Sequence, residues 1–398
     1  MIFQFMNILF LLKSLDTGGL EVVTSVLANE FVKRGHRVCV FSFLGGKNSI
    51  VKRFDKQIKI FERNDYSTSK NNVSMLRKVL IDNHINIIIN QWGLPLVPIK
   101  TAQKAAKELD IKIISVYHNA PSFNGRIQKM NIALMECENP FKRLFLKSVR
   151  FAYKTITSKA MKYIYMNSDL FMVLSPCYIE EFKTFTGIKD TSRLVVMTNP
   201  ITIDNDNFQY NPQNKEKEII YVGRLDFVQK RVYRVIDTWN YLEKRFPNWR
   251  LTIVGDGEDR MNLENHTKAM GLKRVSFEGF KNPLDYYKRA SILLLTSDFE
   301  GFPLVLAECM SFGVVPAVYA SYAAVYDIID DGIDGIILQP ETEKGYDAEN
   351  MANKVAVMME STKTLQTMAI KAIEKSKNYS INQIYQSWVT IIEGLIKI

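Results

Sequence analysis

The sequence predicts an α/β protein of two doubly wound, parallel-sheet domains of Rossmann type. Three observations carry this prediction. The chain has 398 residues, more than one ordinary hydrophobic core takes. Apolar, β-branched runs alternate with stretches of helical periodicity through both halves of the chain. A segment rich in Asn, Asp, Gln and Pro, 201–217, separates the two series as a linker would. We therefore expect an N-terminal domain over residues 1–200 and a C-terminal domain over 201–380.

The first series opens with a β-α-β unit. Residues 8–12 predict a strand, apolar residues at helical spacing predict a helix over 21–34 that Gly35 ends, and 37–43 predict the next strand. Such a unit pairs its strands in parallel through a right-handed crossover. Further strands are expected at 85–89, 111–117, 170–174 and 194–197.

The second series repeats the alternation after the linker. It predicts strands at 219–222, 250–254, 275–278, 292–296 and 315–318, with helices at 232–245, 259–270 and 303–312. The chain then ends in an apolar-rich helix, 381–398, which we expect to pack back on the first domain.

The composition indicates a globular protein of a reducing compartment. Hydrophobic residues make up 47% and charged residues 24% of the chain. The four cysteines are widely spaced and form no CxxC pair, which argues against a zinc site or a disulfide framework. Residues 1–12 lack a basic leader and a small-residue cleavage site and are too short to cross a bilayer, so a buried first strand is expected there. A cytoplasmic location follows.

The net charge of +10 is unevenly placed. Residues 1–200 hold 29 Lys and Arg against 15 Asp and Glu, a balance of +14, whereas residues 201–398 hold 23 against 27, a balance of −4. This asymmetry indicates that the first half faces an anionic partner, with nucleic acid and an acidic membrane surface as the two candidates.

The segment from Ser297 to Glu308 carries the sharpest functional signal. A strand is expected to end near Thr296, and Pro303 opens a helix where proline is favoured. The free amides of the first helical turn, those of Leu304 and Val305 among them, form an anion site at the carboxyl edge of the sheet. Glu300 and Glu308 flank that site. A carboxylate on an otherwise apolar helix must be satisfied by something, so we interpret Glu308 as a ligand-binding group rather than an ordinary acidic first-turn residue.

A basic loop follows the first strand of the second domain. Gly223 permits close backbone approach at the strand's end, and Arg224 and Lys230 project from the loop behind it. Two fixed cations near a helix N-terminus suit a diphosphate. Arg231 competes with Lys230 for this role.

Two further strand ends, in the first domain, are candidates for ligand contact. Gly18 and Gly19 lie at the first strand–helix turn, where glycines let the backbone approach a phosphate or sugar. The turn is not a full GxGxxG, and no acidic residue closes the next strand, which disfavours a dinucleotide dehydrogenase. His118 follows the strand at 111–117 and is interpreted as ligand-facing, against the alternative of a loop histidine without function.

Together these residues resemble the retaining GT-B glycosyltransferases, specifically glycosyltransferase family 4 (glycosyl transferases group 1). The resemblance runs over nearly the whole chain and is densest from Ile219 to Leu338. It rests on the following matches: the glutamate pair Glu300 and Glu308 with seven residues between, the Gly-Arg…Lys motif at Gly223, Arg224 and Lys230, the Gly-Asp-Gly turn at 255–257, Val275-x-Phe277-x-Gly279, the Gly-Gly turn at 18–19 and the strand-end His118. Pro303 stands where family members have Gly, which removes one amide from the phosphate site but fixes the helix start.

The resemblance implies a fold, a reaction and roles for individual residues. The fold would be GT-B, with the two domains facing a central cleft. Glu308 would hold the nucleotide ribose, Arg224 and Lys230 would neutralise the diphosphate, and Glu300 with the backbone from Phe302 to Val305 would contact the donor sugar. Phe280 would offer backbone to the base, while Gly18, Gly19 and His118 would close the site from the first domain. Glu300 and His118 are the expected catalytic residues.

No metal or other cofactor is expected. Asp204 and Asp206 form a DxD like the metal motif of another glycosyltransferase fold, but they lie in the linker, away from any expected strand end. In the family, cations of the protein replace the metal.

The stretch 124–165 combines positive charge with apolar residues. It holds nine Lys and Arg, among them Lys142, Arg143, Lys147 and Arg150, against Glu136 and Glu138, with aromatic and aliphatic residues between them. A basic helix with such a face favours an anionic membrane surface. The alternative is a helix that packs on its own domain and keeps its basic side in solvent. Nucleic acid is disfavoured because no nucleic-acid motif is present.

The sequence thus predicts a retaining glycosyltransferase that moves a sugar from a nucleotide sugar, with UDP favoured, to a glycan or lipid-linked acceptor in bacterial surface polysaccharide synthesis. The enzyme would be cytoplasmic, with membrane contact at the inner face of the cytoplasmic membrane. Another nucleotide-sugar enzyme on the same fold, such as an epimerase or an inverting transferase, and a non-catalytic nucleotide-sugar-binding protein are the alternatives.

Overall fold

The computed structural model of the chain describes residues 5–47, 49–135, 137–339 and 345–396. Two compact units make up the chain. The first unit contains Met1–Ser122, Cys137–Thr202 and Tyr379–Ile398, and the second contains Phe123–Glu136 and Ile203–Asn378. The sequence had placed all of 1–200 in the first domain, whereas residues 123–136 group with the second unit. Residues 1–4 of the expected first strand and 397–398 of the expected terminal helix lie outside the described residues.

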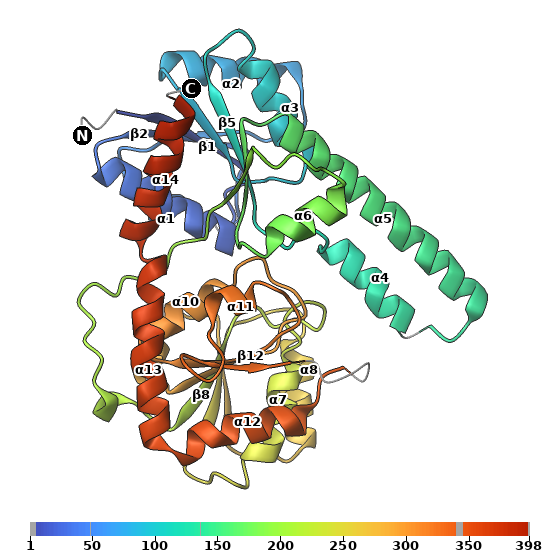
Figure 1. Ribbon diagram of the computed structural model, residues 1–398, viewed down its shortest axis with the longest axis vertical. Coiled ribbons are helices and arrows are strands. Elements are labelled where there is room, and N and C mark those ends of the chain that lie inside the picture. Colours follow the sequence, from blue (N-terminus) through green and yellow to red (C-terminus); the bar gives the residue numbers. More distant parts are fainter. Residues whose placement is uncertain (1–4, 48, 136, 340–344, 397–398) are drawn as a thin grey trace. The chain divides into compact units, whose positions relative to one another are not determined.

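The first unit is built on a seven-stranded parallel sheet in the order β3-β2-β1-β4-β5-β6-β7 (Figure 1). Its strands are β1 (Asn7–Ser14), β2 (Arg37–Leu44), β3 (Lys59–Glu62), β4 (Ile87–Asn90), β5 (Lys112–Tyr117), β6 (Leu170–Val173) and β7 (Leu194–Val196). The central strand β4, Ile-Ile-Ile-Asn, is buried along its whole length, as expected where helices cover both faces of a parallel sheet. Neighbours are in simple register; Ile8 of β1, for example, pairs with Val38 of β2 and Ile87 of β4.

Helices connect and cover these strands. They are α1 (Gly19–Lys33), α2 (Lys70–Asp82), α3 (Leu96–Ala105), α5 (Pro140–Met166), α6 (Tyr178–Thr186) and α14 (Ile381–Ile396), with a short 3-10 helix at Ile50–Arg53 and another at Lys377–Tyr379. The terminal helix α14 lies beside α1 (Figure 1). There the Tyr385 hydroxyl is 2.8 Å from Nε2 of His36, and its ring meets Phe31 edge-on.

The second unit is built on a six-stranded parallel sheet in the order β10-β9-β8-β11-β12-β13. The strands are β8 (Glu218–Val222), β9 (Arg250–Val254), β10 (Val275–Gly279), β11 (Ile292–Leu295), β12 (Val315–Tyr319) and β13 (Ile336–Leu338). The helices are α4 (Gly125–Met135), α7 (Tyr233–Leu242), α8 (Arg260–Ala269), α9 (Leu284–Arg289), α10 (Leu304–Ser311), α11 (Val325–Ile328), α12 (Ala348–Glu360) and α13 (Thr362–Ser376), and a 3-10 helix covers Pro212–Asn214.

The prediction of two doubly wound α/β domains with parallel sheets is confirmed. In each sheet the strand order reverses once, between β1 and β4 in the first unit and between β8 and β11 in the second. Loops that leave the carboxyl ends of two such strands diverge, and the crevice between them is where open α/β sheets bind ligands. The fold therefore directs attention to the loops after β1 and β4, and to those after β8 and β11.

The sequence had suggested that the basic stretch 124–165 is a single helix, but the structure divides it into two. Pro140 begins a separate helix, because proline has no amide to donate within a helix and is favoured in the first turn. Asn139 caps that helix, since its side chain accepts from the amide of Lys142 at 3.0 Å. The stretch thus forms α4 in the second unit and α5 in the first. Among the described residues, no helix combines the length and the apolarity that a bilayer crossing requires.

Candidate active site

The loop after β8 approaches the loop after β9 closely enough to require glycine. Gly223 and Gly255 both take positive φ, +154° and +148°, where L side chains are strained. A Cβ on Gly255 would lie 1.8 Å from the carbonyl oxygen of Gly223. The amide of Gly223 donates to the carbonyl of Val254 at 3.0 Å. This contact fixes the starting position of the loop that follows Gly223.

Asp226 organises the loop that follows. Its Oδ1 accepts from the amides of Val228, Gln229 and Lys230 at 3.1, 2.6 and 3.1 Å, and Oδ2 accepts from Nε of Arg224 at 2.8 Å. Burial opposes ionisation here, but these donors outweigh it and hold the pKa of Asp226 below its usual range. The sequence analysis missed this residue, although an acid that closes a turn by accepting amides two to four residues on is a familiar signal.

Lys230 and Glu300 form a direct ion pair. Nζ of Lys230 lies 2.6 Å from Oε1 of Glu300, and the side chains are only 17% and 8% exposed. Gln229 joins them, since its Nε2 donates to the carbonyl of Phe299 at 3.1 Å and to Oε2 of Glu300 at 3.4 Å. Gln229 also accepts from Arg224 at 3.1 Å. The structure thus brings Arg224, Lys230 and Glu300 into one network at the point where the strand order reverses.

Arg231 belongs to a neighbouring network rather than to this one. Its Nε lies 2.6 Å from Oδ2 of Asp298, and Nη1 of Arg234 lies 2.6 Å from Oδ1 of the same carboxylate. Gln128 of α4 donates to Oδ2 as well, at 3.0 Å. Sequence reasoning assigned no role to Asp298 or Arg234. Arg231 lies in the loop before α7, with a positive φ of 51°, and Arg234 lies in the first turn of that helix, so no helical spacing relates the two cations.

The loop after β11 leads into the N-terminus of α10. Pro303 occupies the N-cap position, and the helix begins at Leu304. The amides of Leu304 and Val305 are in the first turn, where the helix itself offers no acceptor, and both residues are partly exposed. Phe302 before them is buried. Aligned peptide dipoles add positive potential at this end, which suits an anion.

Glu308 lies on the second turn of α10 and is 5% exposed. It accepts a hydrogen bond from the Tyr287 hydroxyl at 3.4 Å. Burial, and then the nearby charge of Glu308, raise the pKa of Tyr287 well above its usual value, so the phenol stays a donor. Phe280 differs from these residues because its side chain is 83% exposed just beyond the end of β10.

The corresponding edge of the first unit is electrically neutral at its centre. His118 follows β5, and its Nε2 lies 2.7 Å from Oε1 of Gln91, the residue that follows β4. Burial lowers the pKa of His118 to about 4, so the ring is neutral at physiological pH. With its Nε2–H donated to Gln91, the ring keeps the Nδ1 lone pair for another donor. Gln91 is 1% exposed and was missed by sequence reasoning.

The Gly-Gly turn lies at the end of β1 in the same unit. Gly18 caps α1, and Gly19 is its first residue. Glu21 in that first turn is buried, and desolvation raises its pKa to about 7. Nζ of Lys13 lies 5.3 Å from the ring centre of Tyr66 and 5.4 Å from that of Trp92.

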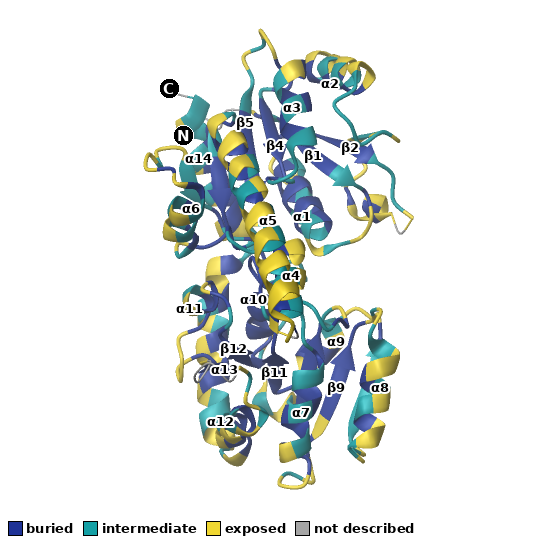
Figure 2. Ribbon diagram, turned by 90° about the vertical axis from the view of Figure 1, so that its right-hand side faces the viewer, coloured by how far each residue is buried: buried dark blue, intermediate teal, exposed yellow. Residues whose placement is uncertain are grey.

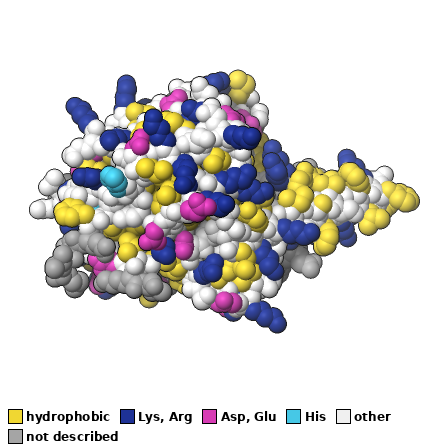
Figure 3. All heavy atoms as spheres, turned by 90° about the horizontal axis from the view of Figure 1, so that it is seen from above, with side chains coloured by type: hydrophobic (Ala, Val, Ile, Leu, Met, Phe, Trp, Pro, Cys, Tyr) yellow, Lys and Arg dark blue, Asp and Glu magenta, His cyan; other side chains and the backbone are white. Residues whose placement is uncertain are grey.

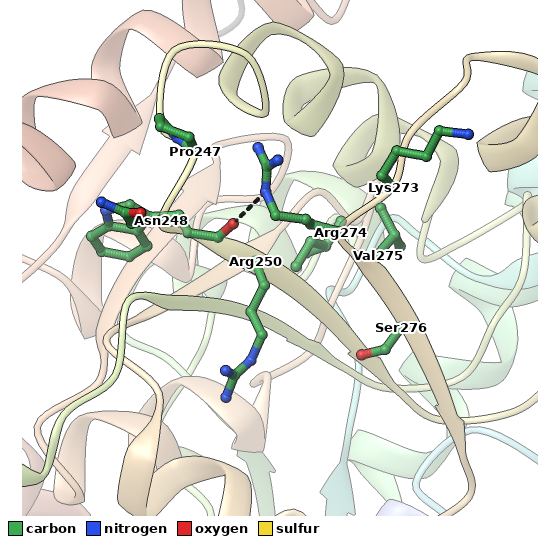
Figure 4. A pocket seen from close by; sticks show the side chains of 9 residues that line it. Pro247, Asn248, Arg250, Lys273, Arg274, Val275 and Ser276 are labelled. Carbon is green, nitrogen blue, oxygen red and sulfur yellow. Dashed lines mark hydrogen bonds between the residues drawn. The ribbon is translucent and has the colours of Figure 1, made fainter.

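A hollow at the opposite edge of the second sheet does not coincide with these residues. It has a volume of about 380 Å³ and is lined by 247–251 and 273–276, where β9 and β10 begin (Figure 4). Its Arg274 donates from Nε to the carbonyl of Trp249 at 3.0 Å, and Arg250 pairs with Glu218 at 3.1 Å. Ligands of open α/β sheets bind at the carboxyl ends of the strands, so we assign no role to this hollow.

Comparison with known proteins decides the family. The model for glycosyl transferases group 1 matches residues 202–375, and the model for glycosyltransferase family 4 matches residues 17–205. The chain is a family 4-like glycosyltransferase of the GT-B fold. It is 26% identical over 394 residues to an uncharacterized glycosyltransferase of Haemophilus influenzae, covering 96% of this chain and 98% of that one.

Two further proteins extend this comparison. An α-1,4-N-acetyl-D-galactosaminyltransferase of Campylobacter jejuni, whose name gives a PP-undecaprenol-linked glycan, is 24% identical over 396 residues, 97% of this chain and 98% of its own. The crystal structure of Anabaena HepE in complex with UDP superposes with a TM-score of 0.75 at 17% identity and covers 98% of this chain and 100% of that one. The predictions of a glycosyltransferase and of the GT-B fold are therefore confirmed.

Proposed function

We propose that this glycosyltransferase binds a nucleotide sugar at the carboxyl edge of the second sheet and transfers the sugar with retention of anomeric configuration. The observation that carries the proposal is the network of Arg224, Lys230 and Glu300 beside the N-terminus of α10. It combines fixed cations, a helix N-terminus and a buried carboxylate at the point where α/β sheets bind ligands.

The diphosphate of the donor is assigned to the positive groups of this edge. When the bond from the sugar to the diphosphate breaks, negative charge develops on the departing phosphate oxygen. Arg224, Lys230 and the first-turn amides of α10 are held in place beforehand, so they stabilise that charge without reorganising. Because these groups supply the positive potential, we propose that no metal is needed. Among the described residues no group of three or more His, Cys, Asp and Glu side chains could hold a metal ion.

The two carboxylates receive separate roles. Glu308, buried on α10, is assigned to the ribose, because its two carboxylate oxygens can accept hydrogen bonds from two ribose hydroxyls. Glu300 is assigned to the donor sugar, and its ion pair with Lys230 holds the carboxylate in place to accept hydrogen bonds from sugar hydroxyls. The backbone of Phe280, an exposed residue just beyond the end of β10, is assigned to the base.

For the substrates, we propose a UDP-sugar donor and a glycan or lipid-linked acceptor in bacterial surface polysaccharide synthesis. HepE, which shares the fold, carries UDP in its crystal structure, which supports the choice of base. The name of the Campylobacter relative includes a PP-undecaprenol-linked glycan, which supports the class of acceptor. The neutral His118–Gln91 edge of the first unit is proposed to contact sugar hydroxyls, since an imidazole lone pair accepts from them without requiring an anion.

Titration calorimetry with UDP-sugars tests the donor site. Glu308→Ala should weaken the affinity for the preferred donor by at least about tenfold while circular dichroism shows an unchanged fold, since one buried carboxylate accepts two hydroxyls. Glu374→Ala provides the matched control, because that carboxylate only pairs with Lys371 at the surface of α13. Wild-type affinity in Glu308→Ala would contradict the assignment. NMR of the first-formed product reports its anomeric configuration, and an inverted product would remove retention from the proposal.

A further inference from the structure

The part of α5 from Phe141 to Ile156 exposes a row of large apolar side chains. Phe141, Leu144, Phe145, Phe151 and Ile156 are 85%, 66%, 66%, 72% and 63% exposed. Figure 2 shows this part of the helix as mostly exposed, in contrast to its C-terminal end. Exposed apolar side chains are common singly, but a contiguous set on one helix marks an interaction surface.

The apolar row points away from the body of its own unit. The buried residues Thr157, Met161, Ile164 and Tyr165 define the side of α5 that packs on the unit. At about 100° per residue, the row from Phe141 to Ile156 is centred about half a turn from that side. The helix therefore cannot cover the row by packing on its own domain, which is the alternative that the sequence left open.

The charge of α5 selects between possible partners. The helix carries seven cations and no Asp or Glu: Lys142, Arg143, Lys147, Arg150, Lys154, Lys159 and Lys162. A second copy of the same helix would bring seven more cations against these and be repelled. In Figure 3, hydrophobic and basic side chains lie together along the projecting part at the right, where α5 runs. This combination is complementary to an anionic lipid surface.

We propose that the outward face of α5, defined by Phe141, Leu144, Phe145, Phe151 and Ile156, inserts into the interface of an anionic phospholipid bilayer. The inference goes beyond the transfer reaction and does not rest on it. The cations in the first half of the helix lie away from the centre of the apolar row. They attract the leaflet at longer range, while the apolar row provides the insertion.

A groove beside the middle of α5 shares Phe151 with the apolar row. It has a volume of about 710 Å³ between α5 and α6, with Phe151 and Phe185 as apolar walls and Lys154 and Lys159 as cations. Neither lysine forms an ion pair with any residue that the structure describes. Its two acids are engaged elsewhere: Glu180 pairs with Lys183 at 2.7 Å, and Glu181 accepts from the amide of Ser122 at 2.8 Å. Apolar walls with free ammonium groups suit an amphiphile with an anionic head.

Co-sedimentation of the full chain with phosphatidylglycerol vesicles tests the proposal at low salt and at about 0.5 M salt, where exposed charges are screened. The triple variant Phe141→Ser, Leu144→Ser, Phe145→Ser should lose at least about tenfold in partitioning at both salt concentrations. The quadruple variant Lys142→Gln, Arg143→Gln, Lys147→Gln, Arg150→Gln should lose binding mainly at low salt. Calorimetry should show unchanged donor affinity in both.

The control replaces three exposed apolar residues elsewhere, Ile81→Ser, Val357→Ser and Ile370→Ser, which are 49%, 57% and 57% exposed, and should bind vesicles like the wild type. Wild-type partitioning that is no stronger on phosphatidylglycerol than on phosphatidylcholine, or unaffected by the triple substitution, would overturn the proposal. A wild type that light scattering finds dimeric and a triple variant that it finds monomeric would instead make this face an interface between copies.

Discussion

The carboxyl edges of the two sheets share a topology and differ in how they hold their polar groups. In the second unit, the loops after β8 and β11 carry charges, and each is paired: Lys230 with Glu300, Arg224 with Asp226, and Asp298 with Arg231 and Arg234. In the first unit, the loops after β4 and β5 carry the neutral Gln91 and His118. Asp16 follows β1, and the first turn of α1 carries Glu21, whose pKa is raised to about 7.

Buried polar atoms without a hydrogen-bond partner occur at both edges among the described residues. They are Tyr66 Oη, Gln91 Nε2 and Trp92 Nε1 in the first unit, and Arg234 Nε and Ser297 Oγ in the second. Unpaired donors are costly, so such groups persist where a ligand or water completes them. The difference in charge between the two edges teaches that one reversal of strand order can serve two chemistries. A charged edge suits a substrate that carries its own charge, and a neutral edge suits hydroxyl groups.

The largest expected effect breaks the charged edge at one residue. Lys230→Ala should lower kcat/KM about 1000-fold, roughly 4 kcal/mol, because it removes a fixed cation from the departing diphosphate and breaks the ion pair with Glu300. Arg231→Ala is the matched control. Asp298 keeps Arg234 at 2.6 Å, so the loss should stay below about fivefold. Steady-state kinetics that show equal losses in both variants would mean that Lys230 has no special role.

The raised pKa of Glu21 at the edge of the first unit should make the free energy of unfolding depend on pH. Glu21 in the folded chain retains a proton that the unfolded chain releases, so the free energy of unfolding falls as pH rises from about 4.5 to about 7. Glu21→Gln mimics the protonated carboxyl and should remove this slope. Denaturant titrations should find the variant more stable than the wild type by up to about 3 kcal/mol at pH 8 and nearly equal at pH 4. Parallel curves across that range would contradict the assignment.

A smaller effect is expected from the residue that positions His118. Gln91→Leu removes the acceptor for the Nε2–H of His118 and should lower kcat about tenfold with the donor affinity unchanged. Gln91→Glu places a carboxylate there and raises the pKa of His118 from about 4. The acidic limb of the pH–rate profile should then move to higher pH. An unmoved limb would show that His118 does not titrate in catalysis.

The smallest effect is expected from metal chelation, which should leave the transfer rate almost unchanged. If the charged edge replaces a metal, EDTA should change the transfer rate by less than about twofold. A loss of tenfold or more that Mn²⁺ or Mg²⁺ restores would assign about 1.4 kcal/mol of the barrier to a metal and would weaken the contrast between the edges.

The sequence predicted those parts of the fold that repeat along the chain. Alternating runs located the strands of both sheets to within one or two residues, because fully buried parallel strands such as β4 and β11 are continuously apolar. The short edge strands β3 and β13 were missed, since three or four residues hold too little pattern. The break at Pro140 was overlooked because the charge pattern runs through it.

The site residues that sequence reasoning found are those with an unusual type at a strand end. Those it missed act through partners that are distant in sequence. Gln91 matters because His118 lies 27 residues later, and Asp298 matters because Arg231 and Arg234 lie 67 and 64 residues earlier. No local spacing reports such contacts, since they exist only once parallel strands bring their carboxyl ends together.

The position of α14 determines the order in which the two units can complete their folding during synthesis. The segment Tyr379–Ile398 follows the whole second unit in the chain and yet belongs to the first. Tyr385 and Trp388 are 1% and 2% exposed there, against a helix made some 350 residues earlier. During synthesis, the second unit can therefore complete its core while the first still lacks a helix of its own and exposes Phe31. Domains usually fold in the order in which they leave the ribosome, and here the earlier one must wait for the later one to finish.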